Sequence, residues 1–112
     1  MEAEEIFEKL RLELRRGAIV LAVLAQLQQE HYGYSLRKAL MASGVDIDEG
    51  TLYPLIRRLE TQGLLQSEWR EEDKRRKRFY RISEVGTEVL SRLTEEWVHL
   101  NSSMAPILKG DQ

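Results

Sequence analysis

Five consecutive cationic side chains, from Lys74 to Arg78, are the residues of this sequence best suited to bind a charged partner. They follow three acidic residues, and two further arginines, Arg57 and Arg58, precede them in the chain. Lysine and arginine bind the phosphates of nucleic acids, and such contacts add affinity without specifying sequence. A run of charge on its own is more often a solvated loop, so the elements around it must decide between the two interpretations.

The segment that contains the two arginines has the pattern of a short amphipathic helix, from about Gly50 to Gly63. Its apolar residues recur at three- and four-residue steps, so they share one face, and the polar residues occupy the remaining faces. Pro54 falls in the first turn, where its missing N–H costs little, and Gly63 suits a left-handed cap. The apolar face consists of Leu52, Leu55, Ile56, Leu59 and Leu64.

A helix of this size fits the major groove of DNA, where side chains reach the base edges. Thr51 and Tyr53, near its N-terminus, are better placed to meet bases or phosphates than Arg58, which can instead pair with a carboxylate. The candidate DNA-binding residues of the helix are Thr51, Tyr53, Pro54, Arg57 and Arg58.

A β-hairpin over about residues 64–82 is predicted to follow the helix. Leu65, Ser67 and Trp69 alternate with polar residues, and residues 79–82 form a β-prone return segment. The basic run between them then forms the hairpin tip, beside the helix that enters the DNA, and this position favours phosphate contact over a solvated loop. The candidate phosphate-binding residues are Lys74, Arg75, Arg76, Lys77 and Arg78.

Two helical segments, over about residues 4–29 and 35–42, are predicted to support this unit, with Ser35 as the N-cap of the second. The start of the helix before a recognition helix commonly crosses the DNA backbone, so Tyr34 and Ser35 are candidate phosphate contacts. For Tyr34, packing against the core is an equal alternative. The exposed face of the same helix adds Arg37 and Lys38.

Residues 84–105 are predicted to form one long helix, with Ser83 as its N-cap and Pro106 setting its end. About 21 residues at 1.5 Å each span roughly 32 Å, so the far half must leave its own core. A two-fold copy of the chain, joined by the first helix, is the simplest cover for the exposed apolar stripe. The stripe consists of Val85, Val89, Leu93, Trp97, Leu100 and Met104. The candidate dimerisation residues are Leu10, Leu14, Val89, Leu93, Trp97, Leu100 and Met104.

The net charge of −2 counts against nucleic acid as a partner when the chain is taken as a whole. The charge is unevenly distributed, however. Residues 37–81 hold 11 of the 17 lysines and arginines and 8 acids, while the two ends together hold 6 basic and 11 acidic residues. The basic part of the chain therefore coincides with the predicted helix and hairpin.

Composition restricts the other functions that the chain can have. Its 112 residues, 42% hydrophobic and 32% charged, predict one folded domain. The absence of cysteine excludes disulfides and agrees with a cytoplasmic location. Two distant histidines, His31 and His99, form no metal motif, and we expect no catalytic residues and no cofactor. The apolar run from Ala18 to Ala25 is too short to cross a bilayer and the N-terminal segment is acidic, so we expect no membrane partner and no signal peptide.

Three segments occur in the order and at the spacing of a known family: HYGYSLRKAL, GTLYPLIRRLETQGLLQSEW and RRKRFYRISEVGTEVL. Together they resemble the PadR family of bacterial winged-helix transcriptional regulators over about residues 15–100, although Ser83 stands where a threonine is common. The resemblance implies a mostly α fold with a small β-hairpin, in which a winged helix-turn-helix DNA-binding domain carries a long C-terminal dimerisation helix. We therefore divide the single domain, residues 1–112, into a winged helix over 4–82, with its wing over about 64–82, and a dimerisation helix over 84–105.

The resemblance also implies a function. It places the chain in the short subgroup with a single C-terminal helix and predicts a dimeric repressor that binds double-stranded DNA. Two recognition helices in such a dimer read a pseudo-palindromic operator with half-sites about 10 bp apart. The fold leaves an alternative open, which is a winged-helix module that binds protein and never contacts DNA.

Trp97, in the segment EEWVHL, resembles the tryptophan with which multidrug-sensing members of that subgroup stack on flat aromatic ligands between two subunits. A small aromatic effector is therefore a further possible partner. The alternative is that Trp97 fills the interface as a packing residue. The candidate effector-binding residues are Trp97, Leu93, Val89, Leu100 and, as a counter-charge for a cationic compound, Glu96. The residues expected to face them from the first helix are Leu10, Leu14 and Ala18.

Overall fold

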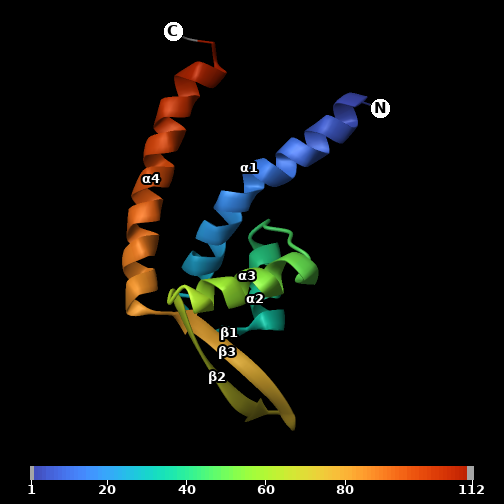
Figure 1. Ribbon diagram of the computed structural model, residues 1–112, viewed down its shortest axis with the longest axis vertical. Helices are drawn as coiled ribbons and strands as arrows, with labels where there is room; N and C mark the ends of the chain where they lie inside the picture. The colour runs from blue at the N-terminus through green and yellow to red at the C-terminus, as the bar shows by residue number, and fades with distance from the viewer. Residues whose placement is uncertain (1, 111–112) are drawn as a thin grey trace.

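The computed structural model describes residues 2–110, which form four helices and a three-stranded antiparallel sheet (Figure 1). This confirms the expected fold class, mostly α with a small β-hairpin. The elements are α1 (Glu2–Gln26), β1 (His31–Tyr32), α2 (Gly33–Ala42), α3 (Glu49–Thr61), β2 (Leu65–Glu72), β3 (Arg75–Ile82) and α4 (Glu84–Leu108).

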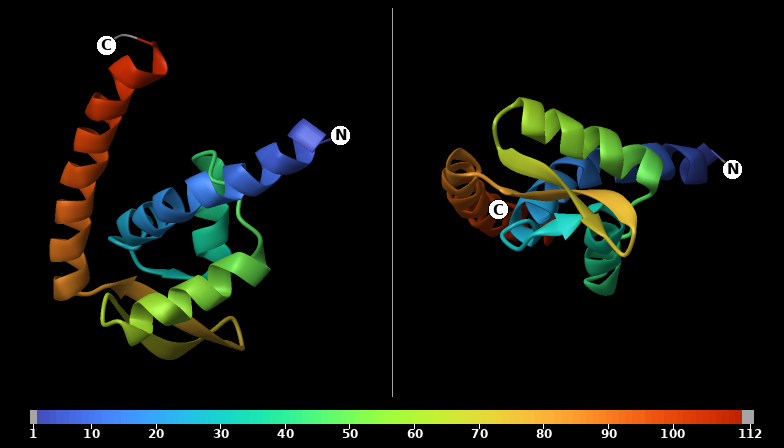
Figure 2. Two further views of the ribbon diagram at one scale, coloured as in Figure 1. Left: turned by 45° about the horizontal axis from the view of Figure 1, so that its top comes forward. Right: turned by 90° about the horizontal axis from the view of Figure 1, so that it is seen from below.

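The core lies where the second half of α1 meets α2, α3, the base of the sheet and the start of α4 (Figures 1 and 2). The apolar face predicted for α3 is buried, since Leu52, Ile56 and Leu59 are at most 1% exposed. Leu64 packs against the same cluster while partly exposed. The other core side chains include Val23, Leu24, Leu27, Leu36, Leu40, Ile47, Leu55, Leu65, Tyr80 and Leu90.

Two helix boundaries differ from those predicted. Helix α1 ends at Gln26 and not near residue 29, because the N–H groups of Gln28 and Gln29 bond only three residues back, as in a tightened last turn. Helix α2 begins at Gly33, and its N-cap is Tyr32 and not Ser35. Ser35 lies one turn inside, where its hydroxyl oxygen accepts a hydrogen bond from the Tyr32 N–H at 3.1 Å. Ser35 therefore caps the helix from its third position.

The β-hairpin spans residues 65–82, close to the predicted range, but its strands are longer and its turn is tighter than predicted. Strands β2 and β3 pair from Leu65 with Ile82 as far as Glu72 with Arg75, which leaves a turn of two residues. These residues, Asp73 and Lys74, both have positive φ, as a tight hairpin turn requires. The prediction that the whole basic run forms the tip is therefore wrong. The acidic residues before the turn lie opposite the basic residues after it, and this pairing of opposite charges extends the ladder.

Strand β1 joins the sheet on the other side of β3, in the order β1-β3-β2. His31 pairs with Tyr80 and Tyr32 pairs with Phe79. Because α2 begins directly after β1, this short pairing brings the N-terminus of α2 against the hairpin.

Helix α4 begins as predicted, with the Ser83 hydroxyl accepting a hydrogen bond from the Gly86 N–H at 3.0 Å. It does not end before Pro106 but continues to Leu108. Proline has a φ that suits a helix, and in this exposed last turn its missing N–H removes one hydrogen bond. At the start of α4 the buried residues are Gly86 and Leu90, while Val85, the first residue of the predicted stripe, is 60% exposed and does not pack in the core of its own chain.

The junction between the hairpin and α4 is tied to the end of α3. The Ser83 N–H donates to the Leu64 carbonyl at 2.9 Å, and the Ser83 hydroxyl donates to the Gly63 carbonyl at 2.7 Å. The Ile82 N–H donates to the Leu27 carbonyl at 2.8 Å, so the end of α1 meets the same point. The junction is therefore held to the C-terminal ends of both α3 and α1.

The first half of α1 and most of α4 extend away from the core and diverge from each other (Figure 1). The described residues measure 57 × 37 × 24 Å, and their radius of gyration is 16.6 Å. A compact domain of this length has a radius of gyration of about 13 Å. Within residues 2–110, no helix combines the length and the apolar composition needed to cross a membrane.

Candidate nucleic-acid interface

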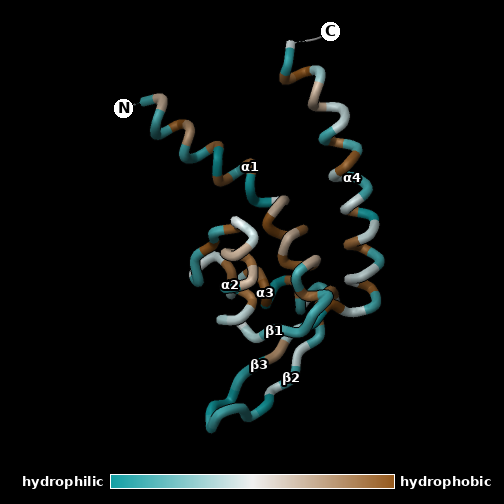
Figure 3. Tube along the Cα trace, turned by 180° about the vertical axis from the view of Figure 1, so that it is seen from behind, coloured by the Kyte–Doolittle hydropathy of each residue, from teal (hydrophilic) through white to brown (hydrophobic). Residues whose placement is uncertain are grey.

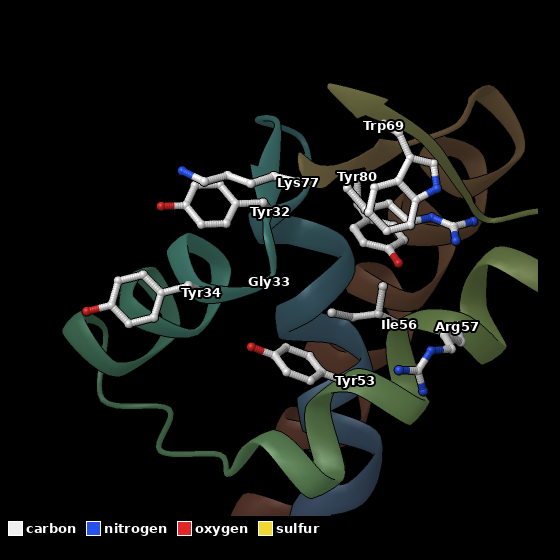
Figure 4. A pocket seen from close by; sticks show the side chains of 10 residues that line it. Tyr32, Gly33, Tyr34, Tyr53, Ile56, Arg57, Trp69, Lys77 and Tyr80 are labelled. Atoms are coloured by element: carbon white, nitrogen blue, oxygen red, sulfur yellow. The ribbon is translucent and has the colours of Figure 1, made fainter. Parts of the chain in front are cut away.

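An open groove of about 310 Å³ runs between the start of α2, the face of α3 and the β-hairpin (Figure 4). Segments far apart in the sequence supply its aromatic and cationic walls, and all four tyrosines of the chain line it. The lining residues are Tyr32, Gly33, Tyr34, Tyr53, Ile56, Arg57, Trp69, Lys77, Arg78 and Tyr80. The structure thus brings together candidates from all three segments that were predicted to contact DNA.

Tyr53 is half-buried and packs against the first residue of α2. A Cβ atom placed on Gly33 would lie 2.7 Å from Cε1 of the Tyr53 ring, closer than side chains tolerate. Glycine at position 33 therefore allows α3 to approach the N-terminus of α2. The ring of Tyr53 fixes this approach, while its hydroxyl end borders the groove (Figure 4).

The remaining candidates on α3 are exposed. Arg57 lines the groove, and Arg58 has no carboxylate within ion-pair distance among residues 2–110. Pro54 lies in the second turn of the helix, on the same exposed surface. The Thr51 hydroxyl donates to Asp48 at 2.7 Å, and this bond lowers the pKa of the Asp48 carboxyl below its ordinary value. Thr51 therefore also secures the start of α3.

The candidates at the start of α2 divide into one exposed side chain and two that are hydrogen-bonded within the chain. Tyr34 is 55% exposed, and its hydroxyl points away from the core (Figure 4). Ser35 is engaged, because its hydroxyl bonds the Tyr32 backbone and the ring of His31. Arg37 is engaged as well, since its Nε donates to the Ile47 carbonyl at 2.9 Å and so holds the connection to α3.

The cations of the hairpin divide according to their position in the ladder. Lys74, in the turn, and Arg75 and Arg76, at the start of β3, are exposed. Successive residues of a strand point to opposite faces, so Arg76 and Arg78 share the face of Trp69. The guanidinium of Arg76 lies 5.2 Å from the centre of the Trp69 ring.

Lys77 lies on the other face of the hairpin, where its ammonium is 4.3 Å from the centre of the Tyr32 ring and 3.3 Å from Glu72. The loss of surrounding water lowers the pKa of Lys77, but the hydrogen bond to Glu72 and the neighbouring Tyr32 hydroxyl raise it by more, so the net shift is upward. Lys77 therefore keeps its positive charge at the edge of the groove.

Arg78 is engaged within the chain. Its guanidinium donates to the Glu60 carboxylate at 3.0 and 3.1 Å and to the Ser67 hydroxyl at 2.9 Å, and Ser67 also donates to Glu60. Glu60 belongs to α3, Ser67 to β2 and Arg78 to β3, so these residues, which we call the latch, hold the hairpin against the recognition helix. The expected role of Arg78 as a phosphate contact competes with this arrangement.

Sequence reasoning missed the place of Tyr80, Trp69 and Glu60 in this region. The sequence pattern assigns Tyr80 only to a β-prone segment, and its alternation with Arg78 and Arg76 along β3 is the signal that places it on the groove side. Glu60 has no such signal, because its pairing with Arg78 depends on how the hairpin folds back over α3.

A second, smaller pocket of about 150 Å³ lies between α1 and α4. Four candidate effector-binding residues, Leu93, Glu96, Trp97 and Leu100, line it, and Val89 does not. Its residues from α1 are Gly17 and Leu21, in place of the expected Leu10, Leu14 and Ala18. Leu10 and Leu14 instead lie on the far half of α1, where they are 56% and 82% exposed.

Comparisons with known proteins agree with this geometry. Residues 20–92 match the model of the transcriptional regulator PadR-like family. The chain is 39% identical over 99 residues to the transcriptional regulator Rv3488 of Mycobacterium tuberculosis, covering 88% of this chain and 90% of that protein.

Among solved structures, a PadR family transcriptional regulator from Eggerthella lenta superposes with a TM-score of 0.88 at 42% identity, covering 96% of each chain. A PadR-like transcription factor from Bacteroides fragilis gives a TM-score of 0.75 at 27% identity, covering 88% of this chain and 98% of that one. These relatives are described as regulators of transcription and not as enzymes. The chain belongs to the PadR-like family of transcriptional regulators.

Proposed function

We propose that this regulator binds operator DNA as a homodimer and represses transcription, with α3 in the major groove and the hairpin on the flanking backbone. The observation that carries the proposal is the groove, which Arg57 of α3 and Lys77 of β3 both line, with Lys74, Arg75 and Arg76 exposed beyond it. In a chain of net charge −2, this concentration of cations on one surface favours a polyanion as the partner. The site of action proposed for it is the cytoplasm.

Apolar side chains on the diverging helices support the homodimer. Phe7 and Leu14 on α1, and Trp97 and Leu108 on α4, are between 48% and 82% exposed in one chain. Figure 3 shows hydrophobic positions recurring along both helices, while the hairpin tip is hydrophilic. A second copy of the chain, related by a two-fold axis, would cover these stripes with the same stripes. It would also set two α3 helices apart for a pseudo-palindromic operator.

The pocket between α1 and α4 supports response to a small aromatic effector. Its 150 Å³ in one chain is less than the roughly 300–1,000 Å³ typical of small-molecule sites, so a second copy would have to enclose the remainder. Trp97 would stack on a flat ring, and Glu96 would balance the charge of a cationic compound. Quenching of Trp97 fluorescence in a Trp69→Phe background, by a panel of planar aromatic compounds, tests this part of the proposal.

Selection of bound sequences from a random DNA pool tests DNA binding, specificity and half-site spacing together. We expect an inverted repeat with half-sites about 10 bp apart. Affinity should also fall linearly with the logarithm of salt concentration, and the Arg75→Ala/Arg76→Ala double variant should reduce that slope by roughly 2. The double variant Arg16→Ala/Arg92→Ala is the matched control, because both arginines are exposed and lie away from the groove. It should leave the slope of affinity against salt unchanged.

The competing possibility, a winged-helix module that binds only protein, makes the opposite prediction. Such a module would show no binding to random-sequence duplex at low salt. That result would reject the DNA-binding proposal as a whole.

A further inference from the structure

Tyr80 has a buried ring whose hydroxyl reaches the open groove between α3 and the hairpin. The residue as a whole is 9% exposed, and no hydrogen bond joins its hydroxyl to another of residues 2–110. Tyrosine suits such a position, where one end of the side chain is apolar and the other is open to water. Figure 4 shows that this hydroxyl points into the groove between α3 and the hairpin. The structure therefore presents a polar group positioned for something outside the chain.

The surroundings of Tyr80 are suited to an anion. Arg57 and Arg78 place positive charge near its hydroxyl, while Lys77, Tyr32 and Tyr53 line other parts of the same groove. None of the residues that line the groove is acidic. Glu60, the nearest acid of α3, is neutralised by Arg78 in the latch.

The protonation of Tyr80 agrees with a donor role. Burial raises the pKa of its hydroxyl above the ordinary value, with the neighbouring Arg78 acting in the opposite direction. The group therefore remains an O–H donor at neutral pH. Proteins commonly bind a phosphodiester by combining uncharged hydrogen-bond donors, such as a tyrosine hydroxyl, with nearby lysine or arginine side chains.

We propose that this groove seats one phosphodiester of the DNA backbone, with the Tyr80 hydroxyl donating a hydrogen bond to a non-bridging phosphate oxygen. Arg57 supplies the compensating charge, and Lys77 lies at the edge of the same groove. This phosphate lies on the DNA strand between the major groove, which α3 enters, and the part of the backbone that the hairpin contacts. This inference rests on the proposed DNA-binding function. It adds an uncharged residue, Tyr80, to the lysines and arginines that were proposed to bind the DNA backbone.

Tyr80→Phe tests the inference, because it removes one oxygen atom and keeps the ring that packs in the core. We expect operator affinity to fall about tenfold, as for a hydrogen bond to a charged acceptor. The slope of affinity against salt should not change, since no charge is removed. The melting temperature should stay the same or rise, since the lost hydroxyl has no partner within the chain. Thr87→Val, which deletes a hydroxyl on the exposed side of α4, is the control and should bind like the parent protein.

A phosphate scan identifies the partner of the hydroxyl. Each backbone phosphate of the selected operator is replaced in turn by a neutral methylphosphonate, and binding is measured for the parent protein and for Tyr80→Phe. We expect one position at which the two changes are not additive, because each removes the same hydrogen bond. Equal affinity of parent and Tyr80→Phe, or additivity at every position, would overturn the inference while leaving DNA binding intact. No binding of any duplex by the parent protein would instead overturn the proposed function, and the inference with it.

Discussion

The region around the groove and the region formed by the diverging ends of α1 and α4 differ in how many of their side chains are already engaged. Around the groove, Arg37 and Arg78 are bonded to their own chain, so the positions of the helices and the hairpin are fixed. On the diverging helices, Leu14 and Trp97 are largely exposed apolar groups. In a single chain, therefore, the groove is already held in place by internal hydrogen bonds, while the apolar faces of α1 and α4 are not yet covered.

The largest effect is expected on α4, at the surface where we propose that a second copy of the chain binds. Leu100→Glu places a charge in the middle of the α4 stripe, at a side chain that is 51% exposed in one chain. The variant should remain folded but monomeric, and operator affinity should fall at least about 100-fold because the two half-sites are no longer bound together. Light scattering and a binding titration measure the two effects.

Ser102→Glu is the matched control for this charge, because position 102 lies on the opposite side of α4 from position 100. It should remain dimeric with unchanged affinity. A dimeric Leu100→Glu protein would show that α4 does not form the interface.

The second prediction concerns the point where the two regions meet. A Cβ atom on Gly86 would lie 2.2 Å from the Leu64 carbonyl oxygen, a backbone atom that cannot move aside alone. Gly86→Ala should therefore lower the free energy of unfolding by about 3 kcal/mol, as strongly overpacked sites do. Denaturant unfolding gives the value.

Gly17 offers the opposite case, since a Cβ atom there meets nothing within 4 Å. Gly17→Ala should raise the free energy of unfolding by up to about 1 kcal/mol through helix propensity. Similar effects of the two substitutions would mean that Gly86 is not packed tightly against the Leu64 carbonyl.

The third prediction asks whether the latch positions the hairpin. Glu60→Gln weakens the bonds to Arg78 and should destabilise the fold by about 1–2 kcal/mol. Removal of a negative charge near DNA ordinarily tightens binding. We expect operator affinity to fall about fivefold instead, because the hairpin loses its fixed angle to α3.

Glu71→Gln, in the exposed part of the hairpin outside the latch, makes the same change of charge and serves as the control. It should bind DNA as tightly as the parent protein or more tightly. If both variants tighten binding equally, the latch has no positioning role.

The smallest effect is a dependence of stability on pH. Burial lowers the pKa of His31 below its ordinary value of 6.5. The unfolded chain therefore takes up a proton at this residue before the folded chain does, so the contribution of His31 to stability is present above pH 6.5 and is lost as the pH falls below it. His31→Gln should flatten the decline in stability between about pH 7 and pH 5.5, measured by urea unfolding. His99→Gln, on exposed α4, should leave the decline unchanged.

The sequence predicts well what depends on local periodicity. The α3 stripe of Leu52, Ile56 and Leu59 is buried, because apolar residues at three- and four-residue steps lie on a single face of a helix, which then packs against the core. The Ser83 cap and the presence of a hairpin follow from equally local patterns. The resemblance to the PadR family rests on the same segments, and the comparisons confirm it.

What depends on the approach of distant segments is not predictable in this way. The basic run was expected in the tip, but Glu71 and Glu72 pair across the ladder with Arg76 and Arg75 and so draw it into the strand. The α1 side of the second pocket is Gly17 and Leu21 because the two helices diverge beyond that point. Neither result is set by spacing along the chain.

The hydrogen bonds of Ser83 to Gly63 and Leu64 join the start of the long helix α4 to the end of α3, so a rotation of one helix about this junction is transmitted to the other. A helix of 25 residues is about 37 Å long, so a turn of about 5° at the junction moves its far end by roughly 3 Å. Conversely, a shift of about 3 Å at the far ends of two paired α4 helices would rotate each α3 helix by about 5°. Small changes in packing far from the DNA would therefore change the angle at which α3 meets the operator.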